Sequence, residues 1–308
     1  MTSLRPTQSP LPNLTVAQLE YLVAAVDAPT WAIAAANLGV SPSALSQGLG
    51  ELERRVGLTL FEPRGRRRVP TPGASPVVAH ARRVLAQTRD LVAWASSARR
   101  GEVGSLRVGM IDAAALHHFA DALRAFRQER PDVDLRLTVA QSGELLDQLA
   151  RGELDIVVCV LPGDPIPDVA AVPLLDEPLF VYGPGGVSAT DPREWGPWVT
   201  FPPASLTRRV IVRALRAVDA QLEVVADSNQ PEVLREMTRL GLGWTVLPAA
   251  QAERLPEPLR PATTAPLVAR TLALARRSSA LPHAAADALA RELTGALTRR
   301  PSRPRLGS

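Results

Sequence analysis

The chain contains 308 residues, of which 46% are hydrophobic, and it carries a formal net charge of +4 and a single cysteine. No apolar run approaches the ~18 residues that a membrane-spanning helix needs, and residues 1–13 lack the apolar segment of a signal peptide, so we expect a cytoplasmic protein without a membrane partner. A single cysteine excludes an intramolecular disulfide and any metal site built on a cysteine pair.

The charge is distributed unevenly along the chain. Residues 1–100 contain 12 Arg and 6 acidic residues, whereas residues 101–295 contain 19 Arg and 25 acidic residues. The first segment therefore has a net charge of +6 and the second a net charge of −6. We expect the front of the chain to bind a polyanion and the mildly acidic middle to form a domain that binds another partner.

Residues 14–72 are expected to form a small, mainly helical domain. Thr30 can cap one helix, and Ser41 followed by Pro42 is an N-cap with proline at the first position of another. About three residues separate these two helices, which is the spacing of a helix-turn-helix. Helices are expected at residues 16–26, at residues 31–38 and from Pro42 onward.

The second helix of such a motif enters the major groove of DNA, and its N-terminal residues meet the base edges. Leu45 and Leu49 fall on its inward face at helical spacing, so the polar residues beside them face outward. With the arginine loop described next, the candidate DNA-binding residues are Thr30, Trp31, Ser41, Pro42, Ser43, Ser46, Gln47, Arg64, Arg66, Arg67 and Arg68.

A run of arginines surrounds Gly65, between two short segments of strand character at residues 58–61 and 69–70. Dense positive charge on a tight loop suits a β-wing that contacts DNA phosphates. The alternative is a solvated surface turn. In either case we expect Leu58, Leu60 and Phe61 to continue the core of the domain.

This domain contains several short sequence motifs. They are the alanine-rich helix Trp31–Leu38, Ser41-Pro42-Ser43-Ala44-Leu45-Ser46, Leu52-Glu53, Leu60-Phe61, Arg64 and Thr71-Pro72-Gly73. Together they resemble the N-terminal signature of LysR-type transcriptional regulators, which implies a winged helix-turn-helix that binds double-stranded DNA. Pro42 and Gly48 depart from the family, which usually has Gln at both positions and faces DNA with them. The resemblance therefore implies no base preference.

Residues 73–100 are expected to form a long linker helix. Its apolar positions alternate at spacings of four and three, which predicts a heptad seam and a two-chain coiled coil. The alternative is a helix packed on its own domain. The seam consists of Val77, Ala81, Val84, Thr88, Leu91 and Ala95. Dimerisation through it would supply the paired recognition helices that half-site binding requires.

From residue 105 to residue 298 strands and helices alternate, which predicts an α/β domain, and the strand-helix-strand-helix-strand succession at residues 106–160 predicts a parallel sheet there. We expect lobe I at residues 105–183 and 265–298, lobe II at residues 184–264, and a disordered Arg/Pro-rich tail at residues 299–308. Strands are expected at residues 106–111, 133–139, 154–160, 179–182, 198–201, 223–226, 244–247 and 267–275, and helices at residues 113–129, 143–151, 205–217, 231–240 and 282–298.

This succession, with the segments 143–159 and 240–248, is similar to the effector domain of LysR-type proteins, which resembles a two-lobed periplasmic binding protein. The resemblance implies a small-molecule effector between the lobes and a homodimer or homotetramer formed through the linker helix and the effector domains. RNA polymerase is a further candidate partner. Neither the effector nor any cofactor can be named from the residues.

Ligands of open α/β sheets bind beyond the carboxyl ends of strands, where helix N-termini offer free N–H groups. This rule selects Asp112, Ser142, Thr200, Ser205, Ser228, Asn229 and Gln230 as candidate effector-binding residues. Ser142, Ser205 and Ser228 have an alternative role as helix N-caps. Asp112 would oppose a carboxylate ligand, or could pair with an amine or a hydroxyl group.

No arrangement of residues indicates an enzyme. His80, His117, His118 and His283 lack metal-ligand spacing, and motifs for nucleophilic catalysis or nucleotide binding are absent. Cys159 lies in an apolar run typical of a buried strand, which favours a packing role over redox sensing.

We therefore expect a nucleoid-associated regulator that binds specific DNA sequences under the control of an effector. The alternative is a small-molecule-binding or enzymatic α/β domain fused to a helix-turn-helix with non-specific DNA affinity.

Overall fold

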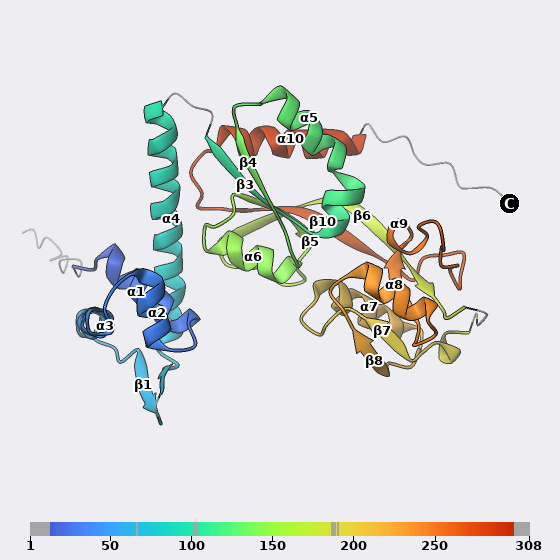
Figure 1. The fold of residues 1–308 in the computed structure, drawn as a ribbon, viewed down its shortest axis with the longest axis horizontal. Coiled ribbons are helices and arrows are strands. Elements are labelled where there is room, and N and C mark those ends of the chain that lie inside the picture. Colours follow the sequence, from blue (N-terminus) through green and yellow to red (C-terminus); the bar gives the residue numbers. More distant parts are fainter. Residues whose placement is uncertain (1–12, 66, 101–103, 186–188, 190, 299–308) are drawn as a thin grey trace, which may run out of the picture. The chain divides into compact units, whose positions relative to one another are not determined.

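The computed structural model describes residues 13–65, 67–100, 104–185, 189 and 191–298. Its contacts divide the chain into two compact units, residues 1–91 and residues 92–308, and each is taken by itself below (Figure 1). Residues 101–103 between the expected linker helix and the α/β domain, the wing residue Arg66 and the C-terminal tail lie outside the described residues. None of the described helices is long and apolar enough to cross a membrane.

The first unit is built from short helices whose ends are set by local hydrogen bonds. Thr15 and Gln18 form a reciprocal capping box, while Thr30 and Ser41 each accept a hydrogen bond from the backbone three residues on. The elements are α1 (Val16–Asp27), α2 (Trp31–Leu38), α3 (Pro42–Val56), β1 (Phe61–Arg64), β2 (Arg67–Pro70) and the first part of α4 (Ala74–Arg100).

The core of this unit joins α1, α2 and α3 to the beginning of α4. Leu22, Leu45 and Leu52 are fully buried, and Ala81 and Leu85 of α4 pack into the same cluster. The first half of the predicted α4 seam is therefore used inside its own unit, where Val77 and Val84 also contact the core. In that half of the helix the alternative, a helix packed on its own domain, describes the contacts seen within the chain, and the two-chain coiled coil stays a prediction.

The two wing strands are shifted from their expected positions. β1 and β2 pair antiparallel from Phe61 opposite Pro70 to Arg64 opposite Arg67, so the arginines lie within the strands and Gly65, with φ of 64°, begins the turn. Leu58 is 48% exposed, contrary to prediction, whereas Leu60 is fully buried. Leu58 lies in the loop between α3 and β1, outside the strand, whereas Leu60 and Phe61 pack into the core of the unit.

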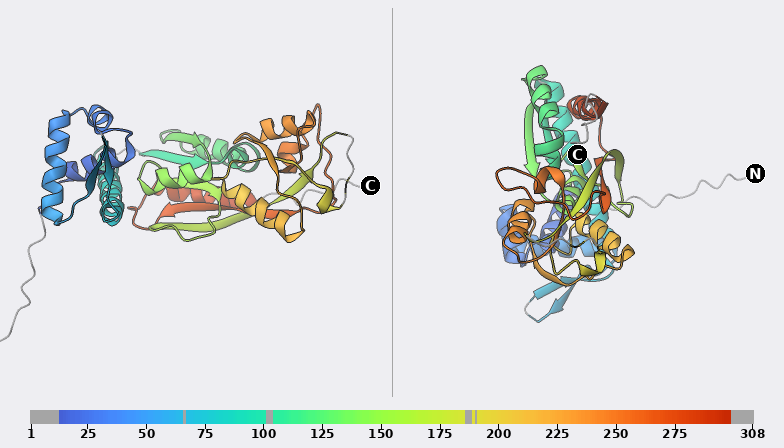
Figure 2. Two further views of the ribbon diagram at one scale, coloured as in Figure 1. Left: turned by 90° about the horizontal axis from the view of Figure 1, so that it is seen from below. Right: turned by 90° about the vertical axis from the view of Figure 1, so that its right-hand side faces the viewer.

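The second unit contains a six-stranded sheet with the order β4-β3-β5-β10-β6-β9 and a separate pair, β7-β8 (Figures 1 and 2). β3 runs parallel to β4 and β5, and β10 runs antiparallel to β5 and β6. The strands are β3 (Ser105–Met110), β4 (Asp134–Val139), β5 (Ile156–Val160), β6 (Val169–Tyr182), β7 (Trp198–Thr200), β8 (Val224–Asp227), β9 (Thr245–Pro248) and β10 (Val268–Arg277).

Helices cover this framework and create two separate hydrophobic cores, which we call lobe I and lobe II. The lobe I core includes residues of β3, β5 and α10, and the lobe II core includes residues of β7, α7 and β9. β6 and β10 contribute to both cores, so they connect the lobes. The helices are η1 (Ala114–His118, a π-helix), α5 (Ala120–Glu129), α6 (Ser142–Ala150), η2 (Pro192–Glu194, a 3₁₀ helix), α7 (Leu206–Ala217), α8 (Pro231–Arg239), α9 (Ala249–Ala252) and α10 (Ala284–Thr298).

Two expectations for this unit were wrong. β6 begins at Val169 rather than Leu179. Pro173 and Pro178 in its early part argue against a strand inside a sheet, so the sequence pattern did not indicate a strand there. The helix expected from Ala113 to Glu129 is broken by the π-helix η1. β9 pairs antiparallel with β6 and so extends the large sheet, and an isolated bridge joins Trp244, just before β9, to Trp198 of β7.

Candidate DNA-binding surface and effector cleft

The N-terminal half of α3 presents polar side chains to solvent. Ser43, Ser46 and Gln47 are exposed, as is Pro42, while Leu45 beside them is fully buried. Ser41 Oγ accepts a hydrogen bond from the Ala44 N–H at 3.1 Å and lies 2.9 Å from Ser43 Oγ. The predicted base-reading residues are thus accessible, and Ser41 serves as the cap that starts the helix.

Trp31 and Arg68 join α2 to the wing. Trp31 lies edge-on to Phe61 with ring centroids 5.1 Å apart, and the Arg68 guanidinium carbon lies 5.1 Å from the centroid of the Trp31 ring. A guanidinium at this distance from an indole ring is attracted by the ring face. Trp31 and Arg68 were predicted to contact DNA, which stays a prediction; in the structure they contact one another and join the hairpin to the helices, and Thr30 caps α2.

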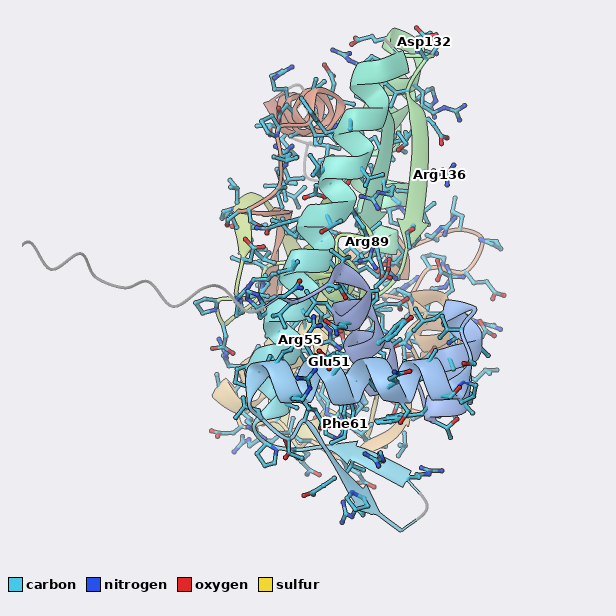
Figure 3. All side chains as sticks on the ribbon, turned by 90° about the vertical axis from the view of Figure 1, so that its left-hand side faces the viewer. Glu51, Arg55, Phe61, Arg89, Asp132 and Arg136 are labelled. Atoms are coloured by element: carbon cyan, nitrogen blue, oxygen red, sulfur yellow. The ribbon has the colours of Figure 1, made fainter. Side chains whose placement is uncertain are left out.

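The base of the wing depends on residues that were not predicted as functional. Glu53 Oε1 accepts hydrogen bonds from the Leu60 and Phe61 N–H groups at 2.7 and 3.1 Å, and the Thr71 hydroxyl donates to the Thr59 carbonyl at 2.8 Å. Figure 3 shows Glu51 on α3 and Phe61 at the start of the hairpin. The Leu52-Glu53 and Leu60-Phe61 motifs therefore act together: the carboxylate of one orients the backbone of the other.

Arg64 and Arg67 face each other across the hairpin as a directly paired set, and both are exposed. Arg68 follows Arg67 in the strand, so it points to the opposite face, toward Trp31. Like charges directly opposite one another destabilise a strand pair. The pair becomes favourable when a polyanion such as a phosphate backbone lies against it.

In the second unit, a cavity of about 500 Å³ contains most of the predicted effector-binding residues. Asp112, Ser142, Ser205, Asn229 and Gln230 line it. They come from the end of β3, the start of α6 and the starts of α7 and α8, on both lobes. A volume of this size suits a small organic ligand.

Thr200 and Ser228 are not among the described residues that line the cavity. The Thr200 side chain is buried, and its carbonyl accepts a hydrogen bond from the Ser228 N–H at 3.0 Å. Ser228 Oγ in turn accepts from the Gln230 N–H at 3.1 Å. These two residues shape the loop that carries Asn229 and Gln230.

The predicted N-cap role holds for one of the three serines. Ser205 caps α7 by accepting from the Arg208 N–H. Ser142 instead lies inside α6, where it is buried and accepts a hydrogen bond from the Val160 N–H at 3.1 Å. Gln141 and Gln230 stand at the N-cap positions of α6 and α8, and neither makes a side-chain cap hydrogen bond.

Asp112 links the two sides of the cavity. Its Oδ2 accepts a hydrogen bond of 3.0 Å from Gln251 Nε2, which belongs to α9. Burial raises the pKa of Asp112, and the negative charges of Glu232 and Glu177 add to this effect, while the Ala113 N–H and Arg270 oppose it. Gln251 was not predicted, because nothing local indicates a contact between residues so distant in sequence.

Arg270, Glu177, His118 and Thr207 form a polar cluster, of which Arg270 and Thr207 line the cavity. Arg270 of β10 and Glu177 of β6 are register partners, and Arg270 Nη2 lies 2.6 Å from Glu177 Oε2. Arg270 Nη1 also donates to Thr207 Oγ1 at 2.8 Å, and His118 Nε2 lies 2.5 Å from Glu177 Oε1. Burial raises the pKa of Glu177, but the His118 and Arg270 contacts outweigh it and the pKa lies below its ordinary value.

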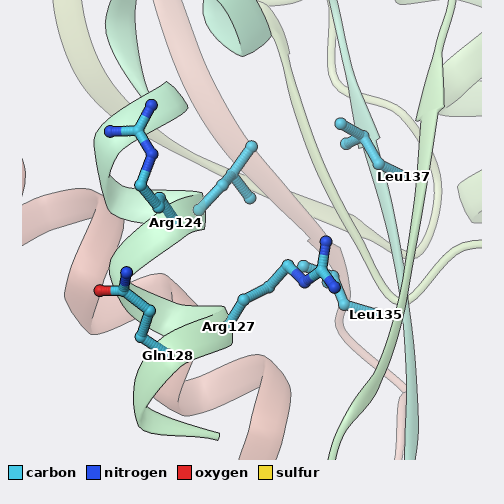
Figure 4. A pocket seen from close by; sticks show the side chains of 6 residues that line it. Arg124, Arg127, Gln128, Leu135 and Leu137 are labelled. Atoms are coloured by element: carbon cyan, nitrogen blue, oxygen red, sulfur yellow. The ribbon is translucent and has the colours of Figure 1, made fainter. Parts of the chain in front are cut away.

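A second cavity of about 490 Å³ lies on lobe I between α5 and the edge strand β4 (Figure 4). Leu123, Arg124 and Arg127 line it from the helix, and Leu135 and Leu137 line it from the strand. An edge strand has backbone N–H and C=O groups without partners in its own sheet. The groove therefore offers apolar surface, positive charge and backbone hydrogen bonds side by side.

Cys159 is completely buried in β5, and burial raises the pKa of its thiol to about 12. No group of three or more His, Cys, Asp or Glu side chains within the described part of the chain is placed to hold a metal ion.

Both units match models of one protein family. Residues 16–75 match the model described as bacterial regulatory helix-turn-helix protein, lysR family, and residues 99–298 match the LysR substrate binding domain. The chain belongs to the LysR family of transcriptional regulators. It is thus a LysR-type DNA-binding regulator with an effector-binding domain, as its sequence motifs predicted.

Relatives with assigned names are regulators rather than enzymes. The chain is 29% identical over 301 residues to a probable hydrogen peroxide-inducible genes activator of Streptomyces viridosporus, covering 94% of this chain and 96% of the relative. It is 28% identical over 249 residues to the DNA-binding transcriptional dual regulator OxyR of Escherichia coli, covering 77% and 79%.

Solved structures of LysR-type regulators share the fold. A full-length OxyR variant from Pseudomonas aeruginosa aligns with a TM-score of 0.61 at 25% identity, covering 93% of this chain and 95% of that one. CbnR in complex with its target DNA aligns with a TM-score of 0.59 at 21% identity, covering 92% and 99%.

Proposed function

We propose that this LysR-type regulator binds specific DNA sequences with α3 in the major groove and the β1–β2 wing on the phosphate backbone. The observation that carries this proposal is the exposed pair Arg64 and Arg67 on a hairpin tied to the helices by Arg68 and Trp31. The exposed side chains of Ser43, Ser46 and Gln47 would then meet the base edges.

The cavity between lobes I and II is the proposed effector site. Asp112, Ser142, Ser205, Asn229 and Gln230 would contact the ligand, and Thr200 and Ser228 would support the loop around it. β6 and β10 connect the lobes, so a ligand held from both sides can change how they close. Catalysis is not part of this proposal, since no observation favours the enzymatic alternative.

Assembly is proposed to involve the outer half of α4 and the effector domains. Leu91 and Trp94 on α4 are 54% and 55% exposed, and the groove between α5 and β4 is open on lobe I. A dimer would bring two recognition helices to two half-sites. Contact with RNA polymerase, residence in the cytoplasm and association with the nucleoid remain predictions from the sequence.

The names of several relatives raise the question of peroxide sensing. A thiol reacts with peroxide as the thiolate, and burial with a raised pKa suppresses that form. Cys159 is the chain's single cysteine and is buried in this way. We therefore propose that the regulator responds to reversible binding in the cleft and not to oxidation of a cysteine.

The DNA-binding proposal is tested by gel shift and footprinting on DNA upstream of the gene, over a range of salt concentrations. Arg67→Ala should weaken binding to all sequences alike and reduce the salt slope by about 1, because it removes one phosphate contact. Gln47→Ala should instead reduce discrimination between bases by about 1–3 kcal/mol.

Arg136→Ala is the matched control, since Arg136 is exposed on β4 of the other unit (Figure 3). Its removal should leave DNA affinity unchanged. An affinity that does not fall with rising salt, or an equal loss across sequences for Arg67→Ala and Gln47→Ala, would contradict the assignment of roles.

A further inference from the structure

The cavity between the lobes has an excess of negative charge. Of the described residues that line it, Asp112, Glu144 and Glu232 carry carboxylates and Arg270 alone carries a positive charge. Glu232 has an exposed partner, Arg254, at 3.7 Å, but a solvent-exposed pair at this distance is weak. Asp112 and Glu144 face the cavity with no guanidinium paired to them in the described contacts.

Arg270, although it lines the cavity, is already ion-paired within the protein. Its side chain is 4% exposed, its Nε donates to Glu177 Oε2 at 2.7 Å, and Nη2 lies 2.6 Å from the same oxygen. Nη1 donates to Thr207 Oγ1. Nε and Nη1 therefore each donate a hydrogen bond inside the protein, Nη2 makes an ion pair but no hydrogen bond among the described residues, and the charge is compensated by a buried carboxylate.

Two of the three helix starts at the cavity wall, those of α6 and α8, do not favour an anion; α7, capped by Ser205, has no acidic residue in its first turn. A helix N-terminus carries roughly half a positive charge, and the starts of α6 and α8 are free of side-chain caps. Each of these helices has a carboxylate in its first turn, Glu144 in α6 and Glu232 in α8. A full negative charge next to roughly half a positive charge leaves each start net negative.

Asp112, the third cavity-lining carboxylate, is the candidate partner of a ligand. Its side chain is half-buried at the end of β3, and the one described side-chain hydrogen bond to it comes from the neutral amide of Gln251. Burial raises the pKa of Asp112, in keeping with a carboxylate that has no directly paired cation among its described contacts. A ligand that brings a positive charge would supply the missing compensation.

We propose that the effector is an organic amine whose ammonium group pairs with Asp112. Its apolar part would lie against Ile111, Val139 and Phe201, which line the same cavity, and its polar groups could reach Asn229 and Gln230. The inference rests on the proposed function of this cleft as the effector site and adds the chemical class of the ligand.

The test compares ligands that share a skeleton and differ in charge. Benzylamine is compared with benzoate and benzyl alcohol, and cyclohexylamine with cyclohexanecarboxylate and cyclohexanol, by thermal shift and calorimetry of the full chain at neutral pH and constant ionic strength. The amine of each set should stabilise the protein and bind about tenfold or more tightly than its carboxylate.

Asp112→Asn should remove this preference by lowering amine affinity by a factor on the order of ten. Asp121→Asn is the matched control, because the Asp121 side chain is 94% exposed on α5. The wild-type comparison does not depend on either variant folding. Stabilisation by no amine, equal or tighter binding of the carboxylates, or unchanged amine affinity in a folded Asp112→Asn protein would each overturn the proposal.

These failures are distinct from a failure of the proposed function. If the protein protects specific operator DNA but binds carboxylates more tightly than amines, the proposed ligand class is wrong and the proposed function is supported. A protein that shows no specific DNA binding would contradict the proposed function, whichever ligand it prefers.

Discussion

Gly48 is required by the way α3 packs on α1. A Cβ atom at this position would lie 2.5 Å from Tyr21 Cδ2 and 2.8 Å from Tyr21 Cε2, well inside van der Waals contact. The LysR-type pattern usually has Gln here, and the Tyr21 ring occupies the space that such a side chain would need. The departure from the family pattern is therefore a matter of helix packing in this chain.

Gly48→Ala should destabilise the first unit by about 1–3 kcal/mol, since the Tyr21 ring must move to admit the methyl group. Gly50 supplies the control within the same helix: nothing lies within 4 Å of a Cβ added there. Gly50→Ala should stabilise by about 0.5–1 kcal/mol through helix propensity. Urea unfolding measures the change in the free energy of unfolding for both variants. Equal stabilisation by the two would mean that the Tyr21 ring moves aside with no loss of stability.

At the scale of elements, α4 changes its role along its length. Its beginning packs into the first unit through Ala81 and Leu85, whereas Leu91, Val92 and Trp94 are 54%, 61% and 55% exposed. Large apolar side chains gathered on one exposed helix mark an interaction surface. The heptad spacing found in the sequence is thus divided between packing inside one chain and a surface open to another.

Leu91→Ser should weaken self-association, because less apolar surface would be buried in the interface. The free energy of association should become less favourable by roughly 1–3 kcal/mol per protomer. Leu91→Met is the matched control, because it keeps the volume and the apolar character and should leave association nearly unchanged. Light scattering after size-exclusion chromatography over a dilution series measures the effect. An unchanged mass for Leu91→Ser at every concentration would place the interface elsewhere.

At the scale of the whole effector domain, the two lobes meet around carboxylates whose pKa values move in opposite directions. The pKa of Glu177 is lowered by its contacts with His118 and Arg270, so Glu177 stabilises the fold above its ordinary pKa. The pKa of Asp112 is raised by burial above the ordinary value of 3.8. Its contribution is therefore fully present below that value and is lost as pH rises through the raised pKa.

Asp112→Asn should thus match the wild-type protein in stability below about pH 3.8 and become the more stable of the two as pH rises toward neutrality. Asparagine keeps an oxygen that can accept from Gln251 and carries no charge. Denaturant unfolding at several pH values gives the difference directly. A difference that is independent of pH, or that grows toward acid, would contradict the raised pKa.

Local chemistry accounts for what could be predicted from the chain. Thr30, Ser41 and Ser205 were expected at helix starts, and each accepts a hydrogen bond from the third residue on. The exposure of Ser43 and Gln47 followed from helical periodicity. Such interactions span one turn of helix, so short motifs encode them.

The structure corrected features that depend on distant partners. The early part of β6 forms a strand because β10 pairs with it, despite Pro173 and Pro178. Arg270 and Glu177 are 93 positions apart and form a buried pair, and Gln251 reaches Asp112 from 139 positions away. No local sequence pattern predicts such pairs, because the residues come together only when distant segments of the chain pack against each other.

The amino-acid sequence by itself determined the family, the helix-turn-helix and the basic wing, because caps, periodicity and clustered charge act within a few residues. Tertiary structure alone decided the sign of the charge in the cleft. Whether Arg270 faces a ligand or a carboxylate depends on its pairing with Glu177 across two strands, and burial makes that pairing strong enough to remove its charge from the cavity.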